Sequence, residues 1–199
     1  MAVIFSCADA SPKVTSVSAF SIIEFNDEEN FPEYRFSVFT EVSSAVQRAS
    51  SITVENEETG LSWKADCLRK ATDGSKKQWA GYGNFCAPKG RKVPVGKYLL
   101  TYTDFAGEQW EGSFKISYSE DFLNSRAGDF PDAIKVSKVE RIVLYDSNGD
   151  LLFYGDLKKE WADKAKLLSE YPDAVTARNF YYISSMNTVV VMPERNLLE

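Results

Sequence analysis

The side chains with the most distinctive chemistry are three aromatic residues that precede a cysteine. Trp79, Tyr82 and Phe85 lie among small residues, and Cys86 follows them directly. Small neighbours leave the rings room to stay exposed, and flat apolar rings stack on sugar faces or anchor a protein partner. We therefore predict that the three rings form a binding surface. Burial of the same rings in a core is the alternative.

Cys67 and Cys86 form a candidate disulfide pair. Eighteen residues lie between them, in sequence that is typical of strands. In an oxidising compartment we expect the two thiols to join. Closing a loop of that length would stabilise the fold by about 3 kcal/mol in the chain-entropy treatment. Two buried thiols are the alternative, and the spacing matches no C-x-x-C redox or zinc motif.

The composition argues against most catalytic sites. The chain contains no histidine, which excludes Ser-His-Asp and Cys-His nucleophiles and histidine-metal centres. It also lacks the G-x-S-x-G and S-x-x-K motifs. A hydrolase with two facing carboxylates remains an alternative, and Glu55, Glu57 and Glu58 belong to a plentiful set of acids. Acids grouped on a surface are usually solvated, so we predict no catalytic residue and no cofactor.

One acidic segment has the opening spacing of a calcium loop. Asp146, Asn148 and Asp150 place three oxygen ligands at alternate positions, and such ligands converge on hard cations. The glycine of the sixth position is replaced by Leu151, and the glutamate of the twelfth by Leu157. The sequence therefore predicts an ordinary hairpin turn and no metal site.

The net charge and hydropathy limit the partners of the chain. The 199 residues carry a formal charge of −6 at pH 7. This charge offers no positive field to a phosphate backbone, so we expect no nucleic-acid partner. No stretch approaches the roughly 20 apolar residues that a membrane-spanning helix requires. We therefore expect no membrane-spanning helix.

The first residues resemble a processing site. Ile4-Phe5-Ser6-Cys7 resembles the end of a bacterial lipoprotein signal peptide, in which an aliphatic and a small residue precede the lipidated cysteine. The resemblance implies a lipid on Cys7, membrane contact only through this lipid anchor, and an exported protein of the periplasm, outer membrane or cell surface. A full signal also has a cationic start and a longer apolar run, so residues 1–12 are expected to be a signal remnant or tether. A first strand over residues 3–5 is the alternative.

Residues 13–119 consist of short segments in which apolar and polar residues alternate, which is typical of an antiparallel sandwich. The alternation from Leu61 to Cys67 places Trp63 and Cys67 on one face of a predicted strand. The clearest hairpin covers residues 94–118, where an Asp-Phe-Ala-Gly turn joins two alternating strands. This hairpin resembles the last one of bacterial immunoglobulin-like and fibronectin-like sandwiches. The resemblance implies an architecture and no particular activity.

A linker at residues 120–133 and a second, smaller unit at residues 134–199 are predicted to follow. An Asn-Gly turn joins the first two strands of this unit, and Asp156 is expected to cap its helix. The elements are expected in the order β-β-α-β-β, at residues 139–145, 151–154, 157–170, 180–183 and 188–192. The predicted fold class is therefore mainly β: an immunoglobulin-like antiparallel β-sandwich with a small β-β-α-β-β module packed on it.

These patterns together predict an exported bacterial envelope lipoprotein with a non-catalytic binding or structural role. Its expected partner is an unidentified protein or glycan of the cell envelope. A carbohydrate-binding module that uses the aromatic loop is the first alternative. A carboxylate-dependent hydrolase is the second.

Overall fold

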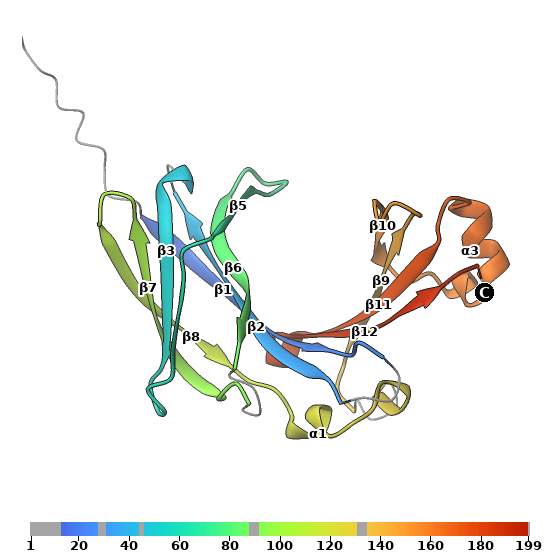
Figure 1. The fold of residues 1–199 in the computed structure, drawn as a ribbon, viewed down its shortest axis with the longest axis horizontal. Coiled ribbons are helices and arrows are strands. Elements are labelled where there is room, and N and C mark those ends of the chain that lie inside the picture. Colours follow the sequence, from blue (N-terminus) through green and yellow to red (C-terminus); the bar gives the residue numbers. More distant parts are fainter. Residues whose placement is uncertain (1–12, 28–30, 44–45, 88–91, 131–134, 199) are drawn as a thin grey trace, which may run out of the picture. The chain divides into compact units, whose positions relative to one another are not determined.

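The computed structural model describes residues 13–27, 31–43, 46–87, 92–130 and 135–198. Within these ranges the protein is mainly β, with one sheet of eight strands, one sheet of four and only short helices (Figure 1). The prediction of a mainly β protein is confirmed. The predicted lipidation site Cys7 lies outside the described residues.

The larger sheet has the strand order β10-β9-β11-β12-β1-β2-β6-β5, and the smaller sheet has the order β4-β3-β7-β8. β1 and β12 run parallel, whereas β12, β11, β9 and β10 are antiparallel to one another in turn. The strand boundaries are β1 (Val14–Glu24), β2 (Glu33–Val42), β3 (Ala49–Asn56), β4 (Ser62–Ala65), β5 (Arg69–Thr72), β6 (Gln78–Cys86), β7 (Gly96–Asp104), β8 (Gln109–Ile116), β9 (Val139–Tyr145), β10 (Leu151–Asp156), β11 (Thr176–Ile183) and β12 (Thr188–Asn196).

The helical segments are short. In the described part of the chain they are α1 (Glu120–Leu123), α3 (Lys164–Glu170) and the 3₁₀ helices η1 (Val46–Arg48), η2 (Ala127–Asp129), η3 (Lys159–Ala162) and η4 (Ser184–Met186). Helices of this length are marginal in water on their own. Tertiary packing therefore has to hold them, and both Phe122 of α1 and Leu167 of α3 are buried.

Two compact units share the strands β1 and β2. Of the described residues, the first unit comprises those in the ranges 13–19, 37–85 and 96–115. The second comprises those in the ranges 20–36, 86–95 and 116–198. Both strands cross from one unit to the other, because the division falls inside each of them.

The first unit is organised around aromatic residues of β7. Tyr98 and Tyr102 are fully buried, and the rings of Trp63 and Phe114 lie 6.2 and 5.2 Å from the Tyr98 ring. The predicted hairpin over residues 94–118 is confirmed, because β7 and β8 are hydrogen-bonded neighbours joined by a short turn.

Asp104 fixes the turn of this hairpin. Its side chain accepts hydrogen bonds from the backbone N–H groups of Ala106 at 2.8 Å and Glu108 at 3.0 Å. It also lies 2.9 Å from a guanidinium nitrogen of Arg48. Because the carboxylate is buried, these partners offset the cost of removing its charge from water.

One face of the second unit's sheet is covered by residues 120–130. Phe122, Ala127 and Phe130 are buried against Phe25 and Tyr181. The Phe130 ring lies 5.3 Å from the Phe25 ring and 5.2 Å from the Phe122 ring. The segment that the sequence identifies as a linker thus supplies side chains to a core.

A second cluster lies on the same side of this sheet. Trp161 of η3 and Leu167 of α3 pack with Ile142 and Leu144 of β9. The Phe153 ring meets the Trp161 ring edge to face at 5.1 Å. β9, β10, α3, β11 and β12 follow the predicted order of elements.

The predicted helix over residues 157–170 is divided into η3 and α3. Asp163 interrupts it with an extended backbone, φ −88° and ψ 109°, and its side chain accepts a hydrogen bond from the Ala165 N–H at 3.0 Å. It thereby caps α3. The predicted cap, Asp156, instead lies in β10 opposite Arg141.

Candidate functional site

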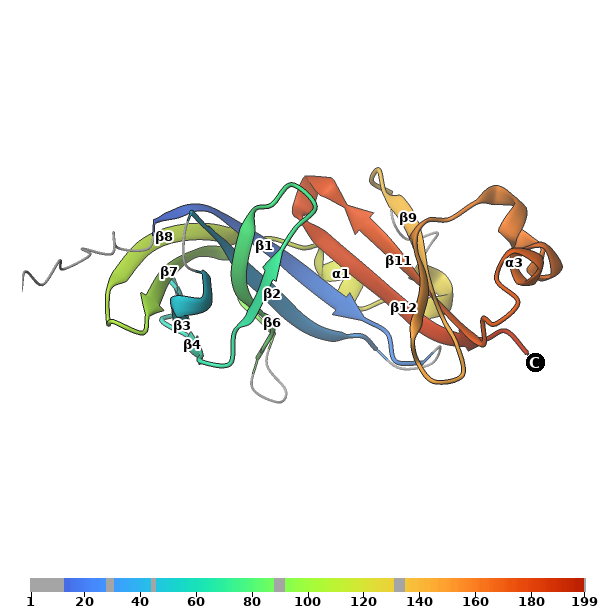
Figure 2. The ribbon, with the colours of Figure 1, turned by 90° about the horizontal axis from the view of Figure 1, so that it is seen from above.

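The second unit's sheet has one covered face and one partly open face. Successive side chains of a strand point to opposite faces, so the register assigns each residue to one of them. Ile142, Ala177 and Val190 lie on the covered face and are buried. Figures 1 and 2 show α1 on that side of β11 and β12. We define the open face by the residues of the opposite side: Phe20, Ile22, Glu24, Val139, Arg141, Tyr145, Tyr154, Arg178, Phe180, Tyr182, Val189 and Glu194.

An apolar row crosses four strands of the open face. By register, Tyr182 lies between Val139 and Val189, and Ile22 is the next neighbour of Val189. Val139 is 45% exposed, and the other three residues are partly exposed. Phe20 extends the row, because its ring lies 6.1 Å from the Tyr182 ring. Contiguous apolar surface on a folded protein often marks an interaction site.

The adjacent row carries charges that are paired within the sheet. Glu24 accepts hydrogen bonds from Nη2 of Arg35 at 2.5 Å and Nε of Arg35 at 3.2 Å. Its other oxygen lies 2.8 Å from Nη1 of Arg178. Burial raises the pKa of Glu24, but the hydrogen bond and charge of Arg35, joined by those of Arg178, outweigh it and hold the pKa below its usual value. Glu24 is therefore ionised at neutral pH.

Arg178 is held by a bulge in the sheet. The register between β11 and β12 shifts just after Arg178, next to Pro193, which has no N–H to donate. Nε of Arg178 donates to the carbonyl of Met192 at 2.6 Å, and Nη2 donates to the carbonyl of Phe25 at 3.1 Å. With Glu24, each guanidinium nitrogen has an acceptor. Arg178 is thus a structural cation whose guanidinium is fixed in place by three acceptors.

Aromatic rings and a second arginine border these rows at the sheet edge. The rings of Tyr154 and Phe180 meet edge to face at 6.3 Å. Arg141 lies 5.7 Å from the centre of the Tyr154 ring, and its Nε is 3.1 Å from Asp156. Tyr154 is 56% exposed. Tyrosine and arginine are enriched at the energetic centres of protein interfaces.

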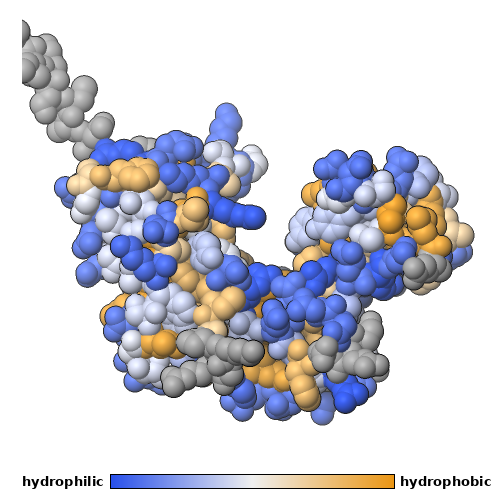
Figure 3. Space-filling model, viewed as in Figure 1, coloured by the Kyte–Doolittle hydropathy of each residue, from blue (hydrophilic) through white to orange (hydrophobic). Residues whose placement is uncertain are grey.

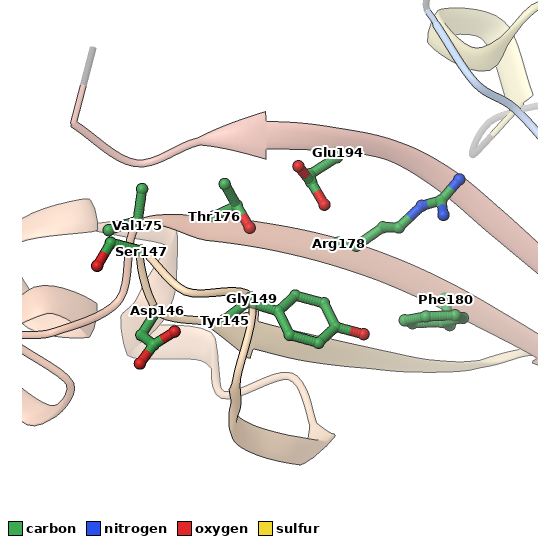
Figure 4. A pocket seen from close by; sticks show the side chains of 9 residues that line it. All are labelled: Tyr145, Asp146, Ser147, Gly149, Val175, Thr176, Arg178, Phe180 and Glu194. Atoms are coloured by element: carbon green, nitrogen blue, oxygen red, sulfur yellow. The ribbon is translucent and has the colours of Figure 1, made fainter.

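An open hollow of about 430 Å³ lies at the polar end of the open face. Figure 4 shows Glu194 reaching from β12 toward β11, while the guanidinium of Arg178 turns away from it. The Tyr145 ring of β9 lies alongside, with its hydroxyl turned toward Phe180. Glu194 is exposed. The hollow is lined by Tyr145, Asp146, Ser147, Gly149, Val175, Thr176, Arg178, Phe180 and Glu194.

Hydrophobic surface also reaches solvent around α3 (Figure 3). Leu157, Leu168 and Tyr171 are partly buried there and pack against the cluster that contains Trp161. These side chains form the outer margin of a core. The apolar row instead lies on the opposite face of the sheet, which makes it the stronger candidate for a contact surface.

The predicted aromatic surface is only partly accessible. Phe85 is 2% exposed and belongs to the core of the first unit, and the Tyr82 ring meets it edge to face at 5.0 Å. Trp79 is half-buried and donates from its indole nitrogen to Asp73 at 3.0 Å. Hydrogen bonds from Ser75 and Trp79 lower the pKa of Asp73 to about 2. Trp79 is thus fixed in the β5–β6 hairpin, and a three-ring platform is not formed.

Cys67 and Cys86 are not joined by a disulfide bond, and both are exposed. The prediction of a disulfide is therefore wrong, and so is the alternative of two buried thiols. Cys67 lies beyond the end of β4, outside the strand predicted for it. An inter-sheet disulfide of a sandwich lies in the core between the sheets, whereas both cysteine side chains are exposed.

The acidic segment after β9 forms a turn, as predicted. Asp146 accepts hydrogen bonds from the backbone N–H groups of Asn148 at 2.8 Å and Asp150 at 2.9 Å. The bond from Asp150 is the largest influence that holds the pKa of Asp146 below its usual value. Within the described residues, no group of three or more His, Cys, Asp or Glu side chains is placed to hold a metal ion. None of the described helices is long and apolar enough to cross a membrane.

No family model, curated protein or solved structure matches the chain. Its function therefore has to be argued from its own surfaces.

Sequence reasoning missed the open face. The pattern from Val139 to Tyr145 alternates, but both of its faces carry apolar residues, such as Val143 on one and Ile142 on the other. A strand pattern of this kind does not reveal which face the helices cover. The only available sign was that Phe180 and Tyr182 alternate with Tyr181, which places aromatic rings on both faces of one strand.

Proposed function

We propose that this chain is a non-catalytic binding protein whose partner docks on the open face of the second unit. The observation that carries the proposal is the apolar row of Val139, Tyr182, Val189 and Ile22, which stays partly exposed although it crosses four strands. Burial of such a row contributes about 25 cal/mol per Å² of apolar surface. A sheet face with aromatic and arginine neighbours suits a protein partner.

We infer that strands β1 to β8 form an immunoglobulin-like sandwich. The order β1-β2-β6-β5 in one sheet and β4-β3-β7-β8 in the other corresponds to the order A-B-E-D and C′-C-F-G of that architecture. The β-β-α-β-β module then extends the first of these sheets through the parallel pairing of β12 with β1. The architecture supports many binding roles and selects none by itself.

We further propose that the protein acts in the bacterial cell envelope, anchored by a lipid at Cys7. This part rests on the resemblance of Ile4-Phe5-Ser6-Cys7 to the end of a lipoprotein signal. The intact mass of the protein from its native host tests it. A lipid-sized increase that maps to Cys7 supports the anchor, and an unmodified Cys7 refutes it.

The docking proposal is tested with two matched variants. Val139→Glu places a charge in the apolar row, whereas Leu99→Glu places the same charge at a residue of the first unit that is also 45% exposed. Each variant and the wild type are purified from the native host under mild cross-linking. We expect Val139→Glu to lose the cross-linked partner and Leu99→Glu to keep it. If both variants retain the cross-linked partner equally and their thermal unfolding is unchanged, the proposal is overturned.

The same experiment separates a protein partner from a glycan. A protein partner gives a cross-linked product that a protease removes and a glycosidase leaves. The glycan alternative relies on Trp79 and Tyr82, so its ligand would be retained by Val139→Glu. That outcome would move the binding site to the first unit and refute docking on the open face.

A further inference from the structure

We propose that the hollow beside β9 and β11 binds an organic cation, such as the guanidinium or ammonium group of an arginine or lysine side chain. The inference deepens the proposed function and rests on it where the cation belongs to a docked protein. It starts from the hollow's volume of about 430 Å³, which is ample for one long side chain.

The charges that line the hollow favour a cation. Two carboxylates, Asp146 and Glu194, belong to its lining. Arg178 is the only cation among the described lining residues, and it shares Glu24, 2.8 Å away, with Arg35. Asp146 and Glu194 outnumber this one cation, so the lining carries net negative charge, and Glu194 supplies the accessible carboxylate because Asp146 already accepts two backbone hydrogen bonds in its turn. The formal charge of −6 on the chain adds long-range attraction for a positively charged ligand.

The aromatic lining favours the same kind of ligand. Tyr145 and Phe180 border the hollow, and cations are attracted to the faces of aromatic rings. The second unit already contains such pairs, because Arg141 lies over Tyr154 at 5.7 Å and Lys158 over Trp161 at 4.6 Å. A ring beside a carboxylate provides an apolar contact for the ligand's stem and a charge for its head.

An anionic ligand fits the hollow poorly. Binding of an anion would require the guanidinium of Arg178, whose nitrogens already contact Met192, Phe25 and Glu24. The exposed carboxylate of Glu194 would also repel it. Glu194, by contrast, extends into the hollow from β12 (Figure 4). We assign Glu194 as the residue that contacts the cation's head group.

The test is a titration followed by NMR of the backbone amides of Thr176 and Glu194. The probes are N-acetyl-arginine amide, butylguanidinium and the uncharged N-acetyl-norleucine amide, each at constant ionic strength. We expect the two cations to shift these amides saturably and the norleucine probe to leave them unchanged. Tighter binding of N-acetyl-arginine amide assigns the cation to a protein side chain, whereas equal binding of butylguanidinium assigns it to a free organic cation. Equal shifts with all three probes would overturn the inference.

Two variants make the test specific. Glu194→Gln keeps the size of the side chain and removes its charge, and Glu111→Gln does the same at an exposed strand residue of the first unit. An exposed ion pair and a cation–π contact are each modest, so we expect Glu194→Gln to weaken binding about two- to fivefold. Glu111→Gln should bind as the wild type does. An unchanged affinity for Glu194→Gln would refute the assignment.

The outcomes also separate this inference from the proposed function. Val139→Glu places a charge in the apolar row and changes no residue that lines the hollow, so it should bind butylguanidinium like the wild type. If Val139→Glu loses the partner while the cations fail to bind the wild type, docking stands and the cation site is refuted. If the cations bind and Val139→Glu keeps its partner, docking is refuted and the hollow serves a free cation.

Discussion

Replacing Glu24 by Gln removes the negative charge that lies between the guanidinium groups of Arg35 and Arg178. The substitution leaves the volume of the side chain nearly unchanged. The side chains involved are only 17% to 27% exposed, so water screens the pair incompletely. Loss of one partner from a buried ion pair costs about 3–5 kcal/mol, and partial exposure lowers this cost. We expect the free energy of unfolding to fall by about 1–3 kcal/mol.

The assay is urea unfolding followed by circular dichroism at a series of pH values. With a slope of about 2 kcal/mol per molar urea, the midpoint should fall by about 1 M at pH 7. The pKa of Glu24 is lowered in the folded protein, so its stabilising effect is complete above the ordinary carboxyl pKa and is lost as pH falls through the lowered value. The difference between wild type and Glu24→Gln should therefore shrink below about pH 4.

Two results would refute this reasoning about Glu24. One is an unchanged urea midpoint for Glu24→Gln at pH 7. The other is a difference from the wild type that persists undiminished at pH 2. Glu111→Gln is the matched control, because Glu111 is an exposed strand residue. It should change the free energy of unfolding by less than about 0.5 kcal/mol.

Three further outcomes are expected. Asp73→Asn should shift the Trp79 indole N–H resonance in NMR at pH 7. The wild type should show the same shift only on acidification to about pH 2, where the pKa of Asp73 lies. A wild-type resonance that stays constant down to pH 1 would contradict this. Cys67 and Cys86 should both react with a thiol reagent in the native protein without prior reduction, and labelling that requires reduction would restore the disulfide. Phe130→Ala should lower the free energy of unfolding by about 3–5 kcal/mol, because the ring is fully buried, and a change under 1 kcal/mol would show that residues 120–130 do not form part of the core.

Local patterns predicted the elements whose structure is set by local chemistry. The turn after β7 was recognisable because Asp104 and Gly107 suit a tight turn. The Asn-Gly turn after β9 was recognisable for the same reason, and Gly149 has the positive φ of 80° that such turns require. The order of elements from β9 to β12 along the chain was predicted in the same way.

Features set by contacts between distant residues were not predictable. The parallel pairing of β1 with β12 joins residues near positions 22 and 189, and no local pattern reports it. The disulfide failed for a related reason, because spacing along the chain does not reveal that both cysteine side chains are exposed and not turned into a core. The open face was missed because β9 is apolar on both sides, and only tertiary packing decides which side stays open.

The most direct test of docking on the open face is photo-cross-linking in the native host. A photoreactive phenylalanine analogue replaces Val139 in one strain and the equally exposed Leu99 in another, and the cross-linked products are compared after irradiation. Our account predicts a discrete product of one reproducible mass from position 139 and none from position 99. A product from position 99 alone, or from neither position, would contradict it.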